Sequence, residues 1–346
     1  MKKKNIFIGL ALSLAVTGCG KEALENTNNN VKEEVKQEEN EESKEAKTEK
    51  KDESKVIYAS FYPIYNLTKQ IAGDKFDVKA FNSLTTESHD FEPSAKEIAE
   101  LSESQLIFMN GAGMEEWKDD VEETIDISMV DTSESLDLIK ADHDHEDAED
   151  HDHEDAEDHD HDHEEGEHHH HHGEFDPHTW LSPVNAKAQA KVIADKLSEI
   201  DSANKDYYQK NYEEIAKEFD EIINEYKEKF AKVENNKFIV PHEAFGYVAR
   251  DFNLEQIPLA SLTSTADPDA KVMKEVTDLA KANKIKTVFF EKGGSDKAAK
   301  TIAEEIGAET APLSTMEFAS EEEIEKEVTI QEIIKENLEN IYKSLA

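Results

Sequence analysis

Residues 55–81 read KVIYASFYPIYNLTKQIAGDKFDVKAF, and this stretch decides the fold class. The apolar run from Val56 to Ser60 predicts a buried strand. Pro63 is suited to the first turn of a helix, which should end before Gly73, and a second strand is expected from Phe76 to Phe81. A strand, a helix and a strand in this order predict a parallel sheet covered by helices.

The same alternation of strands and helices continues through both halves of the chain. In the first half, we expect a helix after Pro93, a strand at 105–109, a helix at 114–124 and a strand at 127–130. In the second half, we expect strands at 237–240, 254–259 and 287–290, and helices at 243–250, after Pro268, at 296–306 and at 321–345. The crossover connections of such parallel units should be right-handed.

Two long helical stretches, 184–200 and 204–233, separate these halves. Large apolar residues recur at helical spacing in the second stretch, which we interpret as a helix linking two lobes. The alternative is an ordinary amphipathic helix inside one lobe. The predicted fold is α/β, with two lobes of parallel sheet joined by a single long helix. Its parts are an N-terminal lobe at 55–200, a linking helix at 201–234 and a C-terminal lobe at 235–346.

The N-terminus has the pattern of a bacterial secretion signal. Three lysines precede an apolar run from Ile6 to Thr17, which is too short to span a bilayer as a mature helix. The run ends at Val16-Thr17-Gly18-Cys19, which resembles a lipobox, so residues 1–19 are predicted to be a lipoprotein signal with Cys19 lipidated. The alternative is a plain signal peptide with a stray cysteine. Because Cys19 is the single cysteine, no internal disulfide can form.

The charge of the chain excludes some partners. Residues 20–54 are mostly charged and polar, which predicts a disordered tether between the membrane and the lobes. The formal net charge of the whole chain is −42. Such a charge excludes nucleic acid as a partner and favours cations, although it also serves solubility. Together with the lipoprotein signal at residues 1–19, the tether predicts an extracytoplasmic location on the bacterial cell membrane.

Twelve of the fifteen histidines are clustered between residues 143 and 172. The cluster begins with a repeat, HDHEDAED at 143–150 and again at 151–158, and it has no apolar periodicity, so we expect it to be disordered. Neutral imidazoles bind zinc, copper and nickel, and a flexible chain should offer several weak, exchanging sites. The alternative is a solvated acidic loop at 142–174 without a metal role. The predicted weak zinc ligands are His143, His145, His151, His153, His159, His161, His163, His168, His169, His170, His171 and His172.

The other three histidines lie where the predicted strands and helices place a cleft. His89 follows the strand that ends near Phe81, His178 precedes a helix, and His242 directly follows the strand at 237–240. In open α/β sheets, the carboxyl ends of the strands face the ligand crevice. Glu291 ends another apolar strand, where burying it alone would be costly. Three imidazoles and a carboxylate would form a tetrahedral zinc site, although any one of these histidines alone is more often structural.

At these residues the chain resembles the metal-binding lipoproteins of the ZnuA and AdcA type, from about residue 55 to residue 346. The motifs that carry the resemblance are SFYPIY at 60–65, SHDFEPS at 88–94, NGAGMEEW at 110–117, FDPHTWLSPVNA at 175–186, PHEAFGY at 241–247 and VFFEKGGSDK at 288–297. The resemblance implies two lobes joined by one long helix, with Zn²⁺ held in the cleft between them and delivered to the permease of an ABC importer. It implies a monomer and a lipid anchor.

Carried over by position, the implied ligands are His89, His178, His242 and Glu291. A histidine at position 242 favours zinc over manganese, because manganese relatives have a carboxylate at that position. The fourth ligand has two alternatives, a carboxylate near His89 or water, since the residues that follow Glu291 depart from the family pattern.

Three other functions are possible. The chain could be a manganese-binding member of the same family or an adhesin-like one. It could also be a secreted zinc hydrolase with an open coordination position, but it has no H-E-x-x-H helix and no evident nucleophile set. We therefore predict a binding protein that is not an enzyme.

Overall fold

The structure is a computed structural model that describes residues 55–141, 173–262 and 268–346. The described residues all belong to one compact unit, Lys51–Ala346. Cys19, the predicted tether and the twelve clustered histidines lie outside the described residues. Among the helices formed by the described residues, none is long and apolar enough to cross a membrane.

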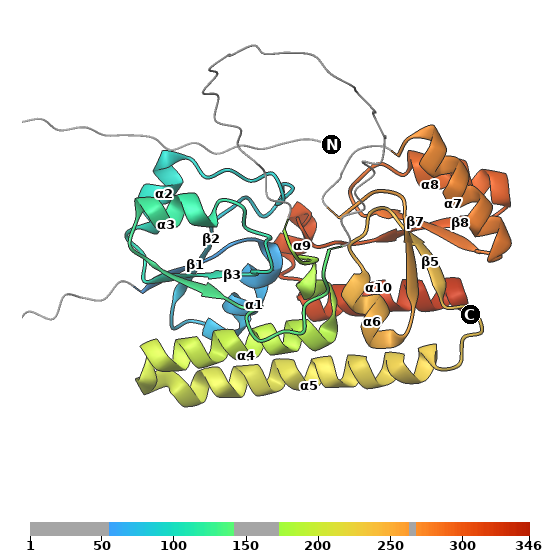
Figure 1. The fold of residues 1–346 in the computed structure, drawn as a ribbon. Helices are drawn as coiled ribbons and strands as arrows, with labels where there is room; N and C mark the ends of the chain where they lie inside the picture. The colour runs from blue at the N-terminus through green and yellow to red at the C-terminus, as the bar shows by residue number, and fades with distance from the viewer. Residues whose placement is uncertain (1–54, 142–172, 263–267) are drawn as a thin grey trace, which may run out of the picture. The chain divides into compact units, whose positions relative to one another are not determined.

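The N-terminal lobe is a four-stranded parallel sheet with helices against it (Figure 1). Its elements are β1 (Val56–Ala59), α1 (Tyr62–Ala72), β2 (Asp77–Ala80), α2 (Ala95–Leu101), β3 (Leu106–Met109), α3 (Lys118–Thr124) and β4 (Ser128–Asp131). The strand order is β2-β1-β3-β4, and every pairing is parallel. The LIFM sequence of β3 is buried along its whole length, as expected for an inner strand of a covered parallel sheet.

The C-terminal lobe repeats this topology with its own four strands. Its elements are β5 (Lys237–Val240), α6 (Gly246–Phe252), β6 (Glu255–Pro258), α7 (Ala270–Ala282), β7 (Thr287–Glu291), α8 (Lys297–Ile306), β8 (Glu309–Leu313), α9 (Glu321–Glu325) and α10 (Ile330–Leu345). The strand order is β6-β5-β7-β8, again parallel throughout. The predicted α/β fold with two parallel sheets is therefore confirmed.

Two long helices connect the sheets. A short 3₁₀ turn, η1 (Thr179–Leu181), leads into α4 (Pro183–Ile200), and a second turn, η2 (Ser202–Asn204), reverses the chain into α5 (Lys205–Phe230). Figure 1 shows α4 beneath the N-terminal lobe and α5 running beneath both lobes. At one end of α5, Asn211 Nδ2 donates to the carbonyl of Ile71 in the N-terminal lobe (3.0 Å). At the other end, the ring of Phe230 packs on Phe252 of the C-terminal lobe, with centroids 5.5 Å apart.

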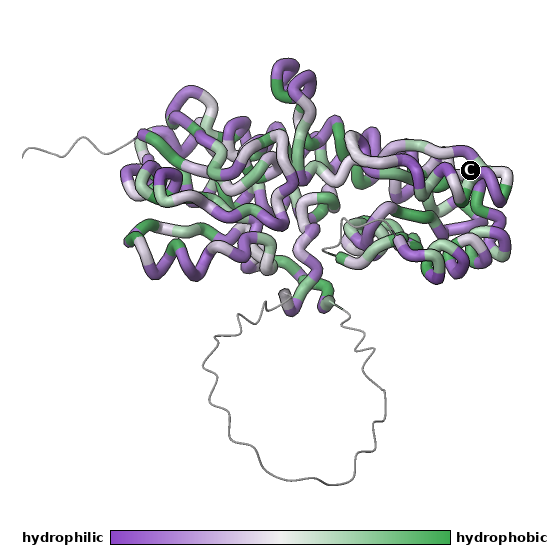
Figure 2. Tube along the Cα trace, turned by 90° about the horizontal axis from the view of Figure 1, so that it is seen from above, coloured by the Kyte–Doolittle hydropathy of each residue, from purple (hydrophilic) through white to green (hydrophobic). Residues whose placement is uncertain are grey.

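The lobes also meet directly, above α5. The carbonyl of Val328, between α9 and α10, accepts hydrogen bonds from Tyr62 Oη and Asn66 Nδ2, both at 2.9 Å. Nearer the sheet edges, the amide of Ala319 donates to the carbonyl of Leu84 (2.7 Å). One hydrophobic core cluster contains residues of both lobes. Figure 2 shows hydrophobic and hydrophilic residues alternating along the helical turns, as expected for helices with one buried face. The edges that carry the ligand loops are thus held against each other.

The structure corrects the sequence reading at the C-terminal end. The edge strand β8 was not predicted, because its short ETAPL sequence contains Pro312, which is unusual in a strand but tolerated at an edge. The single closing helix predicted at 321–345 is two helices. Ser320 and Thr329 each form a capping box, and Glu327 between them has φ 50°, so the backbone leaves the helix there. Helices α3 and α6 also begin later than predicted, at Lys118 and Gly246.

Candidate metal centre

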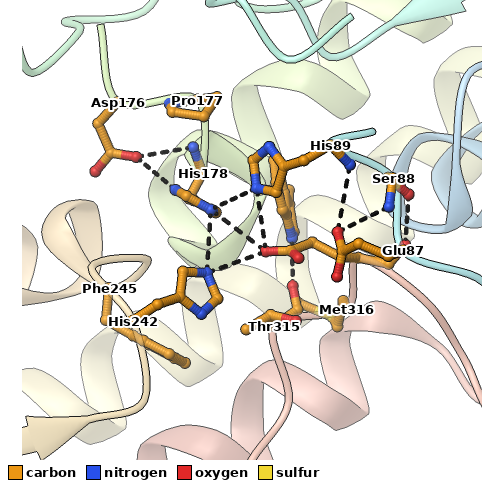
Figure 3. Close-up of polar contacts among 12 residues, drawn as sticks. Glu87, Ser88, His89, Asp176, Pro177, His178, His242, Phe245, Thr315 and Met316 are labelled. Carbon is orange, nitrogen blue, oxygen red and sulfur yellow. Dashed lines mark hydrogen bonds and ion pairs between the residues drawn. The ribbon is translucent and has the colours of Figure 1, made fainter. Parts of the chain in front are cut away.

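Three histidines from distant parts of the chain face one another between the lobes (Figure 3). His89 comes from the loop between β2 and α2, His178 lies directly before η1, and His242 is in the loop that follows β5. The Nε2 atom of His178 lies 3.3 Å from Nε2 of His89 and 3.4 Å from Nε2 of His242. His178 and His242 are buried, with 0% and 5% of their surfaces exposed. The imidazoles therefore present their Nε2 atoms to one common point.

The carboxylate at this point is Glu317. Its Oε1 lies 3.3 Å from the Nε2 atoms of His178 and His242 and 3.6 Å from that of His89. Glu317 comes from the segment after β8 and is 1% exposed. One ligand atom from each of these four residues lies within 4.8 Å of the others. Sequence reasoning missed Glu317, although a prediction of β8 would have placed it beyond the carboxyl end of a strand, as His242 is.

Glu291, the carboxylate predicted from the sequence, lies beside this group. It ends β7, and its Oε1 accepts a hydrogen bond from Thr315 Oγ1. Carboxylate oxygens of Glu291, Glu87 and Glu317 lie within 4.8 Å of one another. The corresponding set of atoms that includes the three histidines contains Glu317 as its carboxylate. The structure therefore offers Glu317, and not Glu291, as the oxygen ligand nearest the imidazoles. The reason is geometric, because the turn after β8 brings Glu317 closer to the Nε2 atoms than the end of β7 brings Glu291.

His178 is oriented by Asp176, two residues before it. Asp176 Oδ1 accepts from the backbone amide of His178 (2.9 Å) and from its Nδ1 (2.8 Å). Since a carboxylate can only accept, Nδ1 carries the hydrogen and Nε2 is left as the metal-facing atom. Burial lowers the pKa of His178, but Asp176 and Glu317 outweigh burial and raise that pKa to about 9. In the metal-free site, the imidazole of His178 is therefore positively charged at neutral pH.

The carboxylates around the histidines have opposite electrostatic environments. Burial raises the pKa of Glu317, but the three facing imidazoles outweigh burial and hold that pKa well below its usual range. Burial and the charge of Glu317 raise the pKa of Glu87 to about 8. Burial and the same charge also raise the pKa of Glu291. The charge of Glu317 is therefore the one that the histidines stabilise.

A buried polar network holds the loop that carries His178. Asn110, at the end of β3, donates from Nδ2 to the carbonyl of Pro177 (2.8 Å). Its Oδ1 accepts from Thr179 Oγ1 (2.6 Å) and from Gln189 Nε2 (2.9 Å). Glu115 accepts from the backbone amide of Asn110 (2.7 Å). The NGAGMEEW motif therefore links the N-terminal sheet to the loop that carries His178 through buried hydrogen bonds.

The donor set fits a metal ion. Neither carboxylate oxygen of Glu317 accepts a hydrogen bond from any described residue, although the side chain is buried. The buried negative charge of Glu317 faces the three imidazoles, and a cation held between them would take the place of the protons that the imidazoles carry. Three imidazole nitrogens and one carboxylate oxygen are a ligand set of tetrahedral Zn²⁺. The burial of this set is suited to enclosing a metal, whereas a hydrolase would leave a coordination position open to its substrate.

The ends of the histidine-rich segment lie together. The amide of Ala141 donates to the carbonyl of Glu174 (3.0 Å), and Lys140 and Phe175 form an antiparallel bridge. The twelve predicted weak ligands of residues 143–172 lie between these ends, outside the described residues. Since Glu174 and Phe175 directly precede Asp176, both described ends of the segment lie near the loop that carries His178.

Sequence comparisons match this chain to proteins of zinc uptake. Residues 57–344 match the family described as ZnuA, the periplasmic component A of a zinc-uptake complex. The high-affinity zinc uptake system protein ZnuA of Bacillus subtilis is 36% identical over 293 residues, which cover 84% of this chain and 87% of that protein. The zinc-binding lipoprotein AdcA of Streptococcus pneumoniae is 32% identical over 291 residues, which cover 82% of this chain but 54% of AdcA. This chain thus spans about half the length of AdcA.

A solved structure matches the whole fold. The laminin-binding protein Lmb of Streptococcus agalactiae, described as bifunctional with adhesin and metal-transporting activity, superimposes with a TM-score of 0.68 at 28% identity. The match covers 84% of this chain and 99% of Lmb.

Proposed function

Because the chain belongs to the ZnuA family of zinc-uptake binding proteins, we propose that it captures Zn²⁺ outside the cell and delivers it to the permease of an ABC importer. The family consists of metal-binding components of zinc uptake and not of enzymes. The proposed ligands are His89, His178, His242 and Glu317, with Glu291 beside the site rather than on the metal. The observation that carries the proposal is the enclosed group of three Nε2 atoms and one buried carboxylate.

Zinc is the proposed cargo for a chemical reason. Three imidazoles favour zinc over manganese, which prefers oxygen ligands, and a manganese-binding member of the family is the alternative. Metal analysis of protein purified without added metal, followed by competition between zinc and manganese, tests the choice. We expect one tightly bound zinc per chain that excess manganese does not displace. Displacement by equimolar manganese would contradict the proposal.

Delivery to a permease is tested in cells. We expect wild-type protein to restore growth of a strain that lacks it when a chelator limits zinc, and His242→Ala to fail although it is present at the same level. Growth restored equally by both would contradict a role of this site in uptake.

The proposed location is the outer face of the cell membrane, with a lipid on Cys19 and the lobes on the tether of residues 20–54. Cys19→Ser should lose incorporation of labelled fatty acid and keep the tight zinc equivalent, and a labelled variant would contradict the assignment. We propose that the protein is a monomer, and analytical sedimentation measures its oligomeric state. The twelve clustered histidines are proposed as weak zinc ligands near the cleft.

An adhesin role is the second candidate, suggested by the likeness to Lmb. Among large hydrophobic side chains of the described residues, Leu279 is the one exposed. The described residues offer no feature that favours adhesion in particular, whereas the buried group of three histidines and Glu317 favours metal capture.

A further inference from the structure

A second group of possible ligands adjoins the histidines and contains oxygen donors alone. One carboxylate oxygen from each of Glu87, Glu291 and Glu317 lies within 4.8 Å of the others. These residues come from three separate segments, the loop before His89, the end of β7 and the turn after β8. Unpaired like charges at this spacing repel one another strongly away from bulk water. In the metal-free protein the raised pKa values of Glu87 and Glu291 relieve this repulsion with protons. A metal cation between the three carboxylates would take the place of those protons.

Two of the three carboxylates, those of Glu87 and Glu291, are anchored through their Oε1 atoms. Glu87 Oε1 accepts from the backbone amides of Ser88 (2.8 Å) and His89 (3.3 Å). Glu291 Oε1 accepts from Thr315 Oγ1. Glu317 Oε1 faces the histidine Nε2 atoms, and its other oxygen, Oε2, is buried without a hydrogen-bond partner among the described residues. These hydrogen bonds hold the side chains of Glu87 and Glu291 in place.

A cavity of about 270 Å³ lies against this group. Glu87, His242 and Glu291 all line the cavity, and the remaining lining is mostly apolar, with Phe289 and Phe290 among its residues. No lysine or arginine is among the described residues that line it. The cavity is therefore large enough for a partly hydrated ion, and no described side chain on its wall supplies a positive charge.

We propose that Glu87, Glu291 and Glu317 form a second cation site, which takes a divalent ion of the oxygen-preferring class, such as Mn²⁺, while zinc occupies the histidines. Carboxylates and water are the ligands that such ions prefer. Glu317 bridges the two ions, with Oε1 toward zinc and Oε2 toward the second ion, an arrangement that carboxylates of two-metal sites provide at separations of about 3.5–4 Å. The proposal rests on the proposed zinc function, since it takes the histidine site as filled.

The test counts Mn²⁺ on the full chain after one equivalent of zinc has been added. Electron paramagnetic resonance of free Mn²⁺ gives the number bound to wild type and to the double variant Glu87→Gln/Glu291→Gln. A charge-matched control is Glu100→Gln/Glu103→Gln, which changes two exposed glutamates of the N-terminal lobe. Weak binding to the acidic segment 142–172 is common to all three proteins and cancels. We expect wild type and the control to bind one Mn²⁺ more than the double variant.

Two results would overturn the second site. One is equal Mn²⁺ binding by all three proteins, and the other is a difference that disappears once zinc is loaded. Chelator competition on the same samples measures the tight zinc equivalent. If the tight zinc equivalent is present in all three proteins, a negative result for Mn²⁺ contradicts the second site alone. Its absence from wild type would contradict the zinc function itself.

A measurement on the unmodified protein does not depend on how the variants fold. Co²⁺ in the histidine site reports its ligand geometry through its visible absorption bands. Because Glu317 is shared, we expect added Mn²⁺ to shift those bands in wild type, without releasing Co²⁺, which binds such sites more tightly than Mn²⁺. Unshifted bands at Mn²⁺ saturation would overturn the bridge.

Discussion

The two lobes have the same strand order but hold their ligands differently. In the N-terminal lobe, His178 is fixed by hydrogen bonds within that lobe, from Asp176 beside it and through Asn110 at the end of β3. In the C-terminal lobe, the segment of Glu317 is held from across the cleft. Its carbonyl accepts from Ser88 Oγ (2.6 Å), and the nearby carbonyl of Thr315 accepts from Trp180 Nε1 (2.7 Å).

This difference means that the ring of His178 is oriented by a contact within its own lobe, whereas the position of Glu317 depends on contacts between the lobes. The Nδ1 atom of His178 donates to Asp176 in its own lobe, which preorganises the ring, whereas its Nε2 atom faces Glu317 of the other lobe (3.3 Å). The carboxylate of Glu317 has no hydrogen-bond partner of its own and is positioned by contacts with the opposite lobe.

The largest effect is expected from removing one imidazole. His178→Ala should weaken zinc binding by about 10³-fold or more, beyond the roughly 10–100-fold that outer partners of ligands contribute. His89→Ala and His242→Ala should behave alike, because each removes one of three nitrogens. Competition with a fluorescent zinc chelator measures the affinities. A His178→Ala protein that still competes like wild type would mean that the metal lies elsewhere.

The next effect distinguishes the two candidate carboxylates. Glu317→Gln should weaken zinc binding by about 10–100-fold, because a neutral amide replaces the charged ligand. Glu291→Gln should change affinity by less than about threefold, since its carboxylate does not reach the imidazoles and its loss relieves repulsion with Glu317. The same chelator competition measures both variants. The reverse order would restore Glu291 as the fourth ligand.

A third effect concerns pH and the preorganised half. In metal-free protein, the pKa of His178 is raised from 6.5 to about 9, so its stabilisation is fully present below about pH 6.5 and lost as pH rises through 9. The raised pKa of Glu87, about 8, acts in the same direction. We expect the melting temperature of metal-free protein to fall between pH 6.5 and 9.5. The contribution of His178 should be at most about 3 kcal/mol.

Asp176→Asn isolates the part of this effect that comes from His178. The variant should lose much of the fall in melting temperature and bind zinc about 10–100-fold more weakly, because Nδ1 no longer faces a carboxylate. Calorimetric scans with chelator present measure the first effect. Asp119→Asn, which changes an exposed aspartate of α3, serves as the matched control that leaves Asp176 in place. An unchanged pH profile in Asp176→Asn would show that His178 does not titrate as described.

The smallest effect is expected from the histidine-rich segment. Its ends are joined by the Ala141–Glu174 hydrogen bond, so a short linker in place of residues 142–172 should leave the lobes folded. The shortened protein should keep one tight zinc equivalent, changed by less than about threefold, and lose several weak equivalents, because a flexible chain does not preorganise a site. Calorimetric titration of both proteins measures the equivalents. Loss of the tight equivalent would show that the segment supplies a primary ligand.

Much of the fold and the three histidines of the candidate metal centre follow from local sequence. The apolar runs at Val56–Ala59 and Leu106–Met109 predict strands because a covered parallel sheet needs continuous apolar residues. A strand that ends directly before its ligand, as β5 does before His242, indicates that the ligand faces the cleft. These signals are local, since burial and helical or strand periodicity are written in neighbouring residues.

Which carboxylate lies nearest the three imidazoles depends on the tertiary structure alone. Glu291 and Glu317 both lie at the carboxyl-end edge of the C-terminal sheet, and neither local sequence states which one reaches the imidazoles. The choice depends on the path of the chain after β8, an edge strand without a strong apolar pattern, and on the hydrogen bonds that Ser88 and Trp180 make across the cleft. Contacts between residues more than a hundred positions apart leave no periodic trace in the sequence. The histidines could therefore be identified from their places on strands and loops, whereas their anionic partner emerged when the two lobes were brought together.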